Sequence, residues 1–140
     1  MAVILLAGCR GSGGDSGAQA ILSHGDEETT VAVEVANTPA EREHGLIGRA
    51  SLPQDEGMVF VYDEDTAGPF WMKDTLVPLS IAFYGGDGSI VRILHMTPCK
   101  SDPCPLYDPG VAYRGALEVN RGAFDRWDIS EGDRLRITSR

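Results

Sequence analysis

The stretch Leu-Ser-Ile-Ala-Phe-Tyr (79–84), Gly-Gly-Asp-Gly (85–88) and Ser-Ile-Val-Arg-Ile-Leu-His (89–95) carries the clearest structural signal in the chain. Two apolar segments, rich in β-branched and aromatic residues, flank a short run that is almost all glycine. Glycine and aspartate readily adopt the positive φ angles that tight hairpin turns require. The stretch therefore predicts a β-hairpin, and we expect a β-rich protein around it.

Other segments outside this hairpin also have the composition of strands. Residues 57–62 form a continuous apolar run, which is typical of a core strand. We expect further strands at residues 30–36, 57–62, 69–73, 112–119 and 134–138. Together with the hairpin, they make about seven short strands.

One short helix is predicted before the core strand. Thr38-Pro39-Ala40-Glu41 has the pattern of a capping box with proline at the first helical position. The expected helix runs to about residue 47 and stops at Gly48, whereas residues 123–127 should form only a short helical turn. The predicted fold class is mainly β: a compact β-sandwich or barrel-like domain with one short N-terminal helix.

Length and charge narrow the class of protein. A chain of 140 residues has the usual size of one domain. Its 21 acidic residues outnumber its 12 lysines and arginines, which gives a formal net charge of −9. Such a field repels nucleic-acid phosphates, so we expect no nucleic-acid partner.

The N-terminus has the character of an export signal. Residues 2–7 are apolar but too few to span a bilayer, which needs about 20 such residues. They end in Leu6-Ala7-Gly8-Cys9, which resembles the lipobox of bacterial lipoproteins, in which the cysteine is lipidated. No basic residue precedes the run, so a truncated signal or a start upstream of Met1 stays open. A short buried strand with a chance cysteine is the alternative.

An export signal of this kind would divide the chain into three parts. We expect a signal peptide at residues 1–8, a lipidated Cys9 with a flexible linker over residues 9–28, and a single domain at residues 29–140. The predicted protein is exported and held by its lipid at the cell membrane or the outer membrane, with the domain outside the cytoplasm. The residue after Cys9 is Arg10 and not the aspartate that retains lipoproteins at the inner membrane. In a cell with two membranes, this favours the outer membrane.

From about Val33 onward the chain resembles the domain of unknown function 192 family. The most specific matching block is Phe-Trp-Met-Lys-Asp-Thr at 70–75, followed by Val-Pro-Leu at 77–79. Other matching blocks lie at 45–49, 52–53, 57–60, 117–119, 122 and 132–133. The resemblance implies a compact β-fold with few helices that is often exported, and it implies no established activity. The family usually has asparagine at the position of Asp74 and often an acidic residue at that of Ser80.

A candidate polar pocket follows from strand alternation and from the family blocks. On a strand, Trp71 and Lys73 point to one face and offer an aromatic plate beside a cation. Glu118 and Asn120 share a face of a later strand, and Arg49 follows the expected end of the helix. The ligand-binding candidates are Arg49, Trp71, Lys73, Asp74, Glu118 and Asn120. The structural alternative is that Trp71 is a core residue and that Lys73 and Glu118 form an ion pair.

The three cysteines need separate explanations. Cys99 and Cys104 lie in a proline-rich loop, and in an oxidising compartment two such thiols usually pair. We therefore expect a Cys99–Cys104 disulfide and no metal or cofactor. A soft-metal site that uses His95, Met96, Cys99 and Cys104 is the alternative, although the spacing is not a strong zinc or copper signature.

Three functional hypotheses remain at this stage. The leading one is an exported accessory module that binds a small molecule or a protein partner near Trp71, Lys73 and Arg49. The second is a hydrolase or lyase that uses a polar cleft around Lys73 and Glu118, with help from Asp74. The third is a metal-handling protein built on the loop cysteines. No phosphate loop, nucleophile elbow or zincin motif is present in the sequence.

Overall fold

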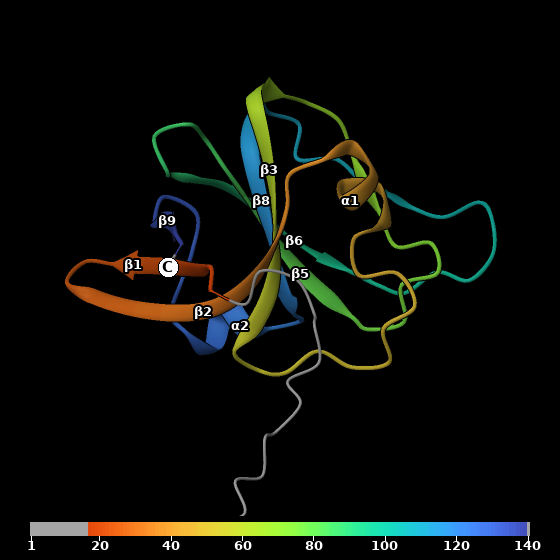
Figure 1. The fold of residues 1–140 in the computed structure, drawn as a ribbon, viewed down its shortest axis with the longest axis horizontal. Helices are drawn as coiled ribbons and strands as arrows, with labels where there is room; N and C mark the ends of the chain where they lie inside the picture. The colour runs from red at the N-terminus through yellow and green to blue at the C-terminus, as the bar shows by residue number, and fades with distance from the viewer. Residues whose placement is uncertain (1–16, 140) are drawn as a thin grey trace, which may run out of the picture.

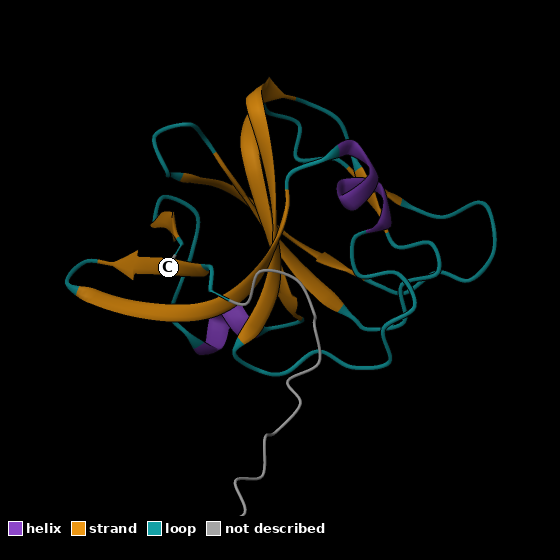
Figure 2. Ribbon diagram, in the orientation of Figure 1, coloured by secondary structure: helices purple, strands orange, loops and turns teal. Residues whose placement is uncertain are grey.

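A computed structural model of the chain describes residues 17–139. Cys9 and the predicted signal peptide lie outside these residues. Nine strands and two short helices follow one another: β1 (Gln19–His24), β2 (Glu27–Ala36), α1 (Pro39–His44), β3 (Glu56–Thr66), β4 (Phe70–Trp71), β5 (Leu79–Tyr84), β6 (Ile90–Met96), β7 (Leu106–Tyr107), β8 (Tyr113–Asn120), α2 (Ala123–Arg126) and β9 (Arg134–Thr138). The mainly β fold class is thereby confirmed, as the predominance of strands in Figure 2 shows.

Seven of the strands form one sheet in the order β6-β5-β8-β3-β2-β1-β9, and β4 and β7 pair separately. Neighbours in the large sheet are antiparallel, apart from the parallel pair β2–β3. The sheet curls until its two edge strands meet at one end (Figure 1), where the Ile90 amide donates to the Asp133 carbonyl at 2.8 Å. Gly88, with a φ of 85°, lets the hairpin come this close, because a Cβ there would lie 2.7 Å from the Leu135 carbonyl oxygen.

The predicted hairpin is present as β5 and β6, which pair from Leu79–Met96 to Tyr84–Ile90. The predicted strand at 134–138 agrees with β9, and the helical turn expected at 123–127 is α2. Helix α1 begins as predicted, since the Thr38 side chain accepts from the Glu41 amide at 3.2 Å. It ends at His44 rather than near residue 47, because Gly45 adopts a positive φ of 50° there.

The domain begins earlier than we predicted. Strand β1 lies inside the stretch 9–28 that we had expected to be a linker, and it pairs with both β2 and β9. Ala20 and Leu22 of β1 are fully buried, so burial of this short alternating strand outweighs the polar sequence around it. Strand β7, within the proline-rich region, was also missed.

Two apolar clusters lie on the two sides of the curled sheet. The first cluster combines residues of β1, β2, β8 and β9 with helix α2, and its fully buried members include Leu22, Val31 and Leu117. The second cluster lies under α1 and β4 and includes Phe60, Met72 and Phe83. The two helices accordingly lie at separate ends of the curled sheet in Figure 1. Alternation along β3 and β8 therefore decides which side chains face which cluster.

No helix within residues 17–139 has the length and apolar character needed to cross a membrane.

Candidate functional site

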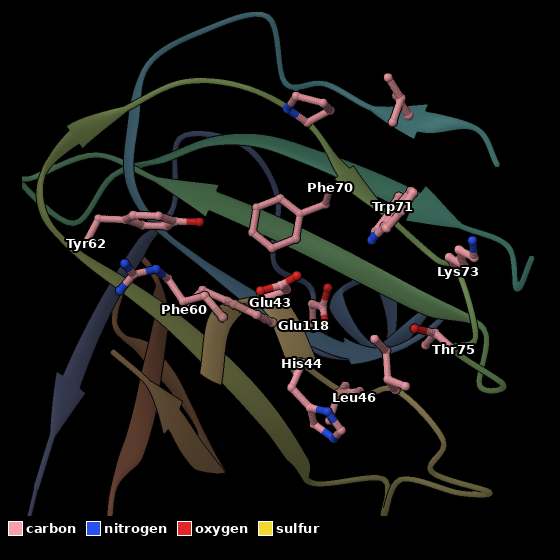
Figure 3. A pocket seen from close by; sticks show the side chains of 15 residues that line it. Glu43, His44, Leu46, Phe60, Tyr62, Phe70, Trp71, Lys73, Thr75 and Glu118 are labelled. Carbon is pink, nitrogen blue, oxygen red and sulfur yellow. The ribbon is translucent and has the colours of Figure 1, made fainter. Parts of the chain in front are cut away.

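A cavity of about 340 Å³ opens between α1, β3, β4 and β8, on the side of the second apolar cluster. Its volume lies at the lower end of the range found for small-molecule sites. Figure 3 shows the side chains around it. The lining combines aromatic and aliphatic groups with a few charged ones: Arg42, Glu43, His44, Gly45, Leu46, Ile47, Phe60, Tyr62, Pro69, Phe70, Trp71, Lys73, Thr75, Leu106 and Glu118.

Glu118 is the buried acidic group of this cavity. Alternation along β8 turns Leu117 and Val119 toward the first cluster and Glu118 toward the second, as the sequence predicted. Its neighbours across the sheet are Met58 on β3 and Ile81 on β5, and neither has a side chain that can donate a hydrogen bond. Glu118 is only 5% exposed.

The surroundings of Glu118 make its charged form costly. Loss of hydration on burial raises the pKa of this carboxyl from its ordinary 4.5 to about 8. Within residues 17–139, every side-chain oxygen that is fully shielded from solvent has a hydrogen-bond partner. The carboxyl oxygens of Glu118 have none, so they must be open to the cavity. In Figure 3 the carboxyl group points into the space below Phe70. The raised pKa favours the protonated form of Glu118 near neutral pH, and no other residue of 17–139 is hydrogen-bonded to its carboxyl group.

A glycine permits the close approach of the strands behind Glu118. Gly57 on β3 faces Val119 of β8 in the strand register. A Cβ atom on Gly57 would overlap the backbone carbonyl oxygen of Glu118. The absence of a side chain therefore lets β3 and β8 pair tightly at the base of the cavity.

Aromatic rings form the walls of the cavity. Phe60 on β3 and Phe70 on β4 meet edge to face, with ring centroids 5.1 Å apart. Tyr62 lies farther along β3, and Trp71 is half exposed at the rim beside Leu106, its strand partner on β7. Trp71 is therefore a rim residue and not the core residue of our structural alternative.

The two cations that line the cavity already have partners. The Arg42 guanidinium lies 4.5 Å from the centre of the Tyr62 ring, and one of its nitrogens donates to the Val61 carbonyl at 3.0 Å. The Lys73 ammonium donates to Asp102 at 2.7 Å, and this pairing raises the pKa of Lys73. The Lys73–Glu118 ion pair of our structural alternative is not formed, because Lys73 turns outward to Asp102.

Three of the six predicted site residues line this cavity, namely Trp71, Lys73 and Glu118. Arg49 instead pairs with Glu34 and lines a second hollow of about 450 Å³ on the other side of α1. Asn120 donates to the carbonyl of Leu52 at 2.6 Å, so it holds a loop.

Asp74 also lies away from the cavity, and its role is in the backbone. Its amide donates to the Cys99 carbonyl at 2.9 Å, and its carbonyl accepts from Gly48. Its φ of 57° is left-handed, a conformation that asparagine and aspartate tolerate better than most residues. The aspartate of this chain therefore suits the position, as would the asparagine that the family resemblance implies there.

Residues of α1 and one buried threonine were missed by the sequence reasoning. Arg42, Glu43 and His44 line the cavity, but the helix signal alone does not say which face of α1 meets the sheet. Thr75 is a buried polar residue on the cavity wall. Its position in the block 70–75 was the one available signal, and its burial appears only in the folded chain.

The loop cysteines do not form a metal site. The sulfur atoms of Cys99 and Cys104 lie 2.14 Å apart, as in a disulfide. His95 has its ring nitrogen 2.8 Å from the Ser80 hydroxyl instead. In the part of the chain that the structure describes, no three histidine, cysteine or acidic side chains come together as metal ligands.

With this geometry in place, comparison with known proteins identifies the family. The family model DUF192, described as an uncharacterized ACR, matches residues 20–137, so the chain belongs to the DUF192 family. No functionally curated protein matches the sequence.

Two solved structures share the fold. A protein from Sinorhizobium meliloti 1021, described as a candidate transcription regulator, is 31% identical. The alignment covers 90% of this chain and 97% of that one, with a TM-score of 0.81. A protein of unknown function from Novosphingobium aromaticivorans DSM 12444 is 28% identical, with 84% and 83% covered and a TM-score of 0.78.

Proposed function

We propose that this protein is a binding module that holds a small organic molecule in the cavity of Glu118. The observation that carries the proposal is a buried carboxyl group that faces an aromatic-lined cavity and is neutralised by desolvation. Burying such a group without a partner costs stability, and binding sites are where proteins commonly retain it. A ligand that hydrogen-bonds to Glu118 would supply the partner that residues 17–139 do not provide.

Binding fits this arrangement better than catalysis. The hydrolase or lyase hypothesis needs Lys73, Glu118 and Asp74 to converge within hydrogen-bond reach. Lys73 is paired with Asp102, and Asp74 does not line the cavity. Burial is the cause that raises the pKa of Glu118, with no hydrogen bond from another described residue contributing. The three groups of that hypothesis therefore do not converge on one point.

The two tryptophans provide a direct test of binding. Trp71 lies at the cavity rim, whereas Trp127 packs against Phe124 beside the first cluster. In a screen of small organic fragments by ¹⁵N–¹H NMR, hits should shift the indole signal of Trp71 and leave that of Trp127 in place. A Glu118→Gln variant should alter the affinities of these hits. Arg49→Ala is the matched control, because Arg49 lines the other hollow. A screen without any hit that shifts Trp71 would contradict the proposal.

The setting of this function is part of the same proposal. The apolar run, the lipobox-like Leu6-Ala7-Gly8-Cys9 and the glycine-rich segment after it support an exported domain tethered by a lipid on Cys9. Expressed from its natural gene in a bacterium, the protein should partition into a detergent phase, and Cys9→Ser should move it to the aqueous phase. Cys99→Ser should leave the partition unchanged. Equal partition of Cys9→Ser and the natural protein would contradict the lipid anchor.

The proposed function includes no role in transcription. A net charge of −9 opposes close contact with DNA phosphates. The absence of a nucleic-acid partner therefore remains part of the proposal.

A further inference from the structure

The charges around the cavity indicate what kind of ligand it can take. The guanidinium of Arg42 lies against the Tyr62 ring and is held by the Val61 carbonyl, and the ammonium of Lys73 is held by Asp102. Lys73 is therefore paired with an acid, whereas Arg42 keeps its remaining N–H donors beside Tyr62. Among residues 17–139, neither carboxyl group of the lining, Glu43 or Glu118, has a side-chain partner, and Glu118 is the buried one.

The aromatic lining also favours a positively charged ligand. The face of an aromatic ring carries partial negative charge and attracts cations. Two protein cations already lie over rings at this site: Arg42 at 4.5 Å from the centre of Tyr62 and Lys73 at 5.7 Å from that of Trp71. Phe60 and Phe70 line the cavity nearer to Glu118 and have no such cation among the described residues.

We propose that the cavity binds a small organic cation, namely an ammonium or guanidinium group attached to an apolar body. The cationic group would lie against the Glu118 carboxylate, and the apolar body would lie against Phe60 and Phe70. This inference rests on the proposed function, because it names the ligand class of the same cavity. An ion pair shielded by aromatic walls is stronger than one in water.

Binding of such a cation must be linked to loss of a proton from Glu118. Burial raises the pKa of this group to about 8 in the free protein, so at pH 7 about one molecule in ten has it ionised. Affinity for a ligand that keeps its positive charge should therefore rise about tenfold between pH 7 and pH 9. A neutral ligand that accepts a hydrogen bond from the protonated carboxyl should instead bind more weakly as pH rises.

Other titratable groups line the cavity and need controls. They are Arg42, Glu43 and His44 from α1, Tyr62 from β3, and Lys73 after β4. Histidine ordinarily titrates near neutral pH, so His44→Gln is the control for this range. The pH dependence should survive His44→Gln and disappear in Glu118→Gln.

Three probes with one apolar body separate the ligand classes: 2-phenylethylammonium, 2-phenylethanol and 3-phenylpropanoate. Each is titrated against the full chain while the Trp71 indole signal is followed by NMR. An alkylammonium, like lysine with its ordinary pKa of about 10.4, keeps its charge up to pH 9. At pH 9 we expect the ammonium to bind about tenfold more tightly than the alcohol and the carboxylate to bind most weakly. In Glu118→Gln the ammonium should lose this advantage.

The outcomes distinguish this inference from the proposed function. If the alcohol or the carboxylate binds as tightly as the ammonium, the ligand class is wrong while the cavity remains a binding site. The inference also fails if the pH dependence persists in Glu118→Gln. If none of the three probes shifts Trp71, the inference fails, and the fragment screen then decides whether the binding function fails with it.

Discussion

The two faces of strand β8 have very different surroundings. Leu117 and Val119 point into the first apolar cluster, where α2 and β9 complete the packing. Ala116 and Glu118 point to the other side of the sheet, and Glu118 borders a cavity of about 340 Å³. A single strand of eight residues thus has one face in a closed core and the other at an open site.

The difference indicates that one face of β8 stabilises the fold and that the other face forms the candidate binding site. The closed face contains only apolar side chains, which stabilise the fold by being removed from water. The open face contains a carboxyl group that is removed from water at a cost. The following changes test this division, from the largest expected effect to the smallest.

The largest effect should come from pH acting on Glu118. The folded chain raises the pKa of this group from 4.5 to about 8, so between these values the folded state binds more protons than the unfolded state. The free energy of unfolding should therefore fall as pH rises from about 5 to 8, by roughly 3 to 4 kcal/mol relative to Glu118→Gln. Urea denaturation of both proteins at pH 5, 6, 7 and 8 measures this difference. A difference that stays constant with pH would show that Glu118 is not desolvated.

Leu117→Ala tests the closed face. Leu117 is completely buried in the first cluster, so truncation removes apolar contacts and leaves a cavity behind. We expect a loss of about 3 kcal/mol in the free energy of unfolding, measured in urea at pH 5. Affinity for probes in the Glu118 cavity should stay unchanged in the fraction that remains folded. A loss below about 1 kcal/mol would mean that the first cluster is not the main source of stability.

Removing the disulfide tests a support of the open face. The loop between Cys99 and Cys104 includes Asp102, the partner of Lys73, and Lys73 forms a β-bridge with Cys99. In the chain-entropy picture, the double variant Cys99→Ala with Cys104→Ala should lose about 2 kcal/mol, since the closed loop is short. Chemical denaturation with and without a reductant measures this. The natural protein under reducing conditions should match the variant, and equal stability in oxidising buffer would contradict a bonded pair.

Leu106→Ala should have the smallest effect on stability. This residue is 66% exposed at the cavity rim, so we expect a change below about 0.5 kcal/mol in the free energy of unfolding. It is the matched counterpart of Leu117→Ala, because the substitution is the same and the surroundings differ. A small loss of affinity for 2-phenylethylammonium, followed by NMR, should accompany it. A stability loss as large as that of Leu117→Ala would contradict the division between the two faces.

Local patterns predicted most of the fold, and the errors have physical reasons. The hairpin at 79–95, the capped start of α1 and the strand at 134–138 depend on neighbouring residues, so they could be predicted without tertiary contacts. Strand β1 forms a local hairpin with β2, but its other neighbour β9 lies about 110 positions away, as in the pair Leu22 and Leu135, and no local pattern indicates that pairing. Strand β7 has only two residues and is defined by its pairing with β4.

The candidate site was predicted only in part for the same reason. Alternation along β8 correctly placed Glu118 and Leu117 on opposite faces of the sheet, and the Trp71 ring does lie at the cavity. Arg49, Asp74 and Asn120 were grouped with them by residue type, but they lie elsewhere because α1 and the loops direct them to backbone partners or to Glu34. Arg42 and Thr75 reach the cavity only through packing that no local pattern encodes.

The amino-acid sequence by itself determined the β-rich class, the family resemblance and the face of β8 on which Glu118 lies. These follow from residue order, because alternation and turn chemistry act between neighbours along the chain. Only the tertiary structure decided that Lys73 pairs with Asp102 and that Glu118 lies between the apolar side chains of Met58 and Ile81. A side chain's partners and its hydration depend on distant segments that folding brings beside it. The titration of Glu118, on which the proposed ligand class depends, is therefore a property of the fold.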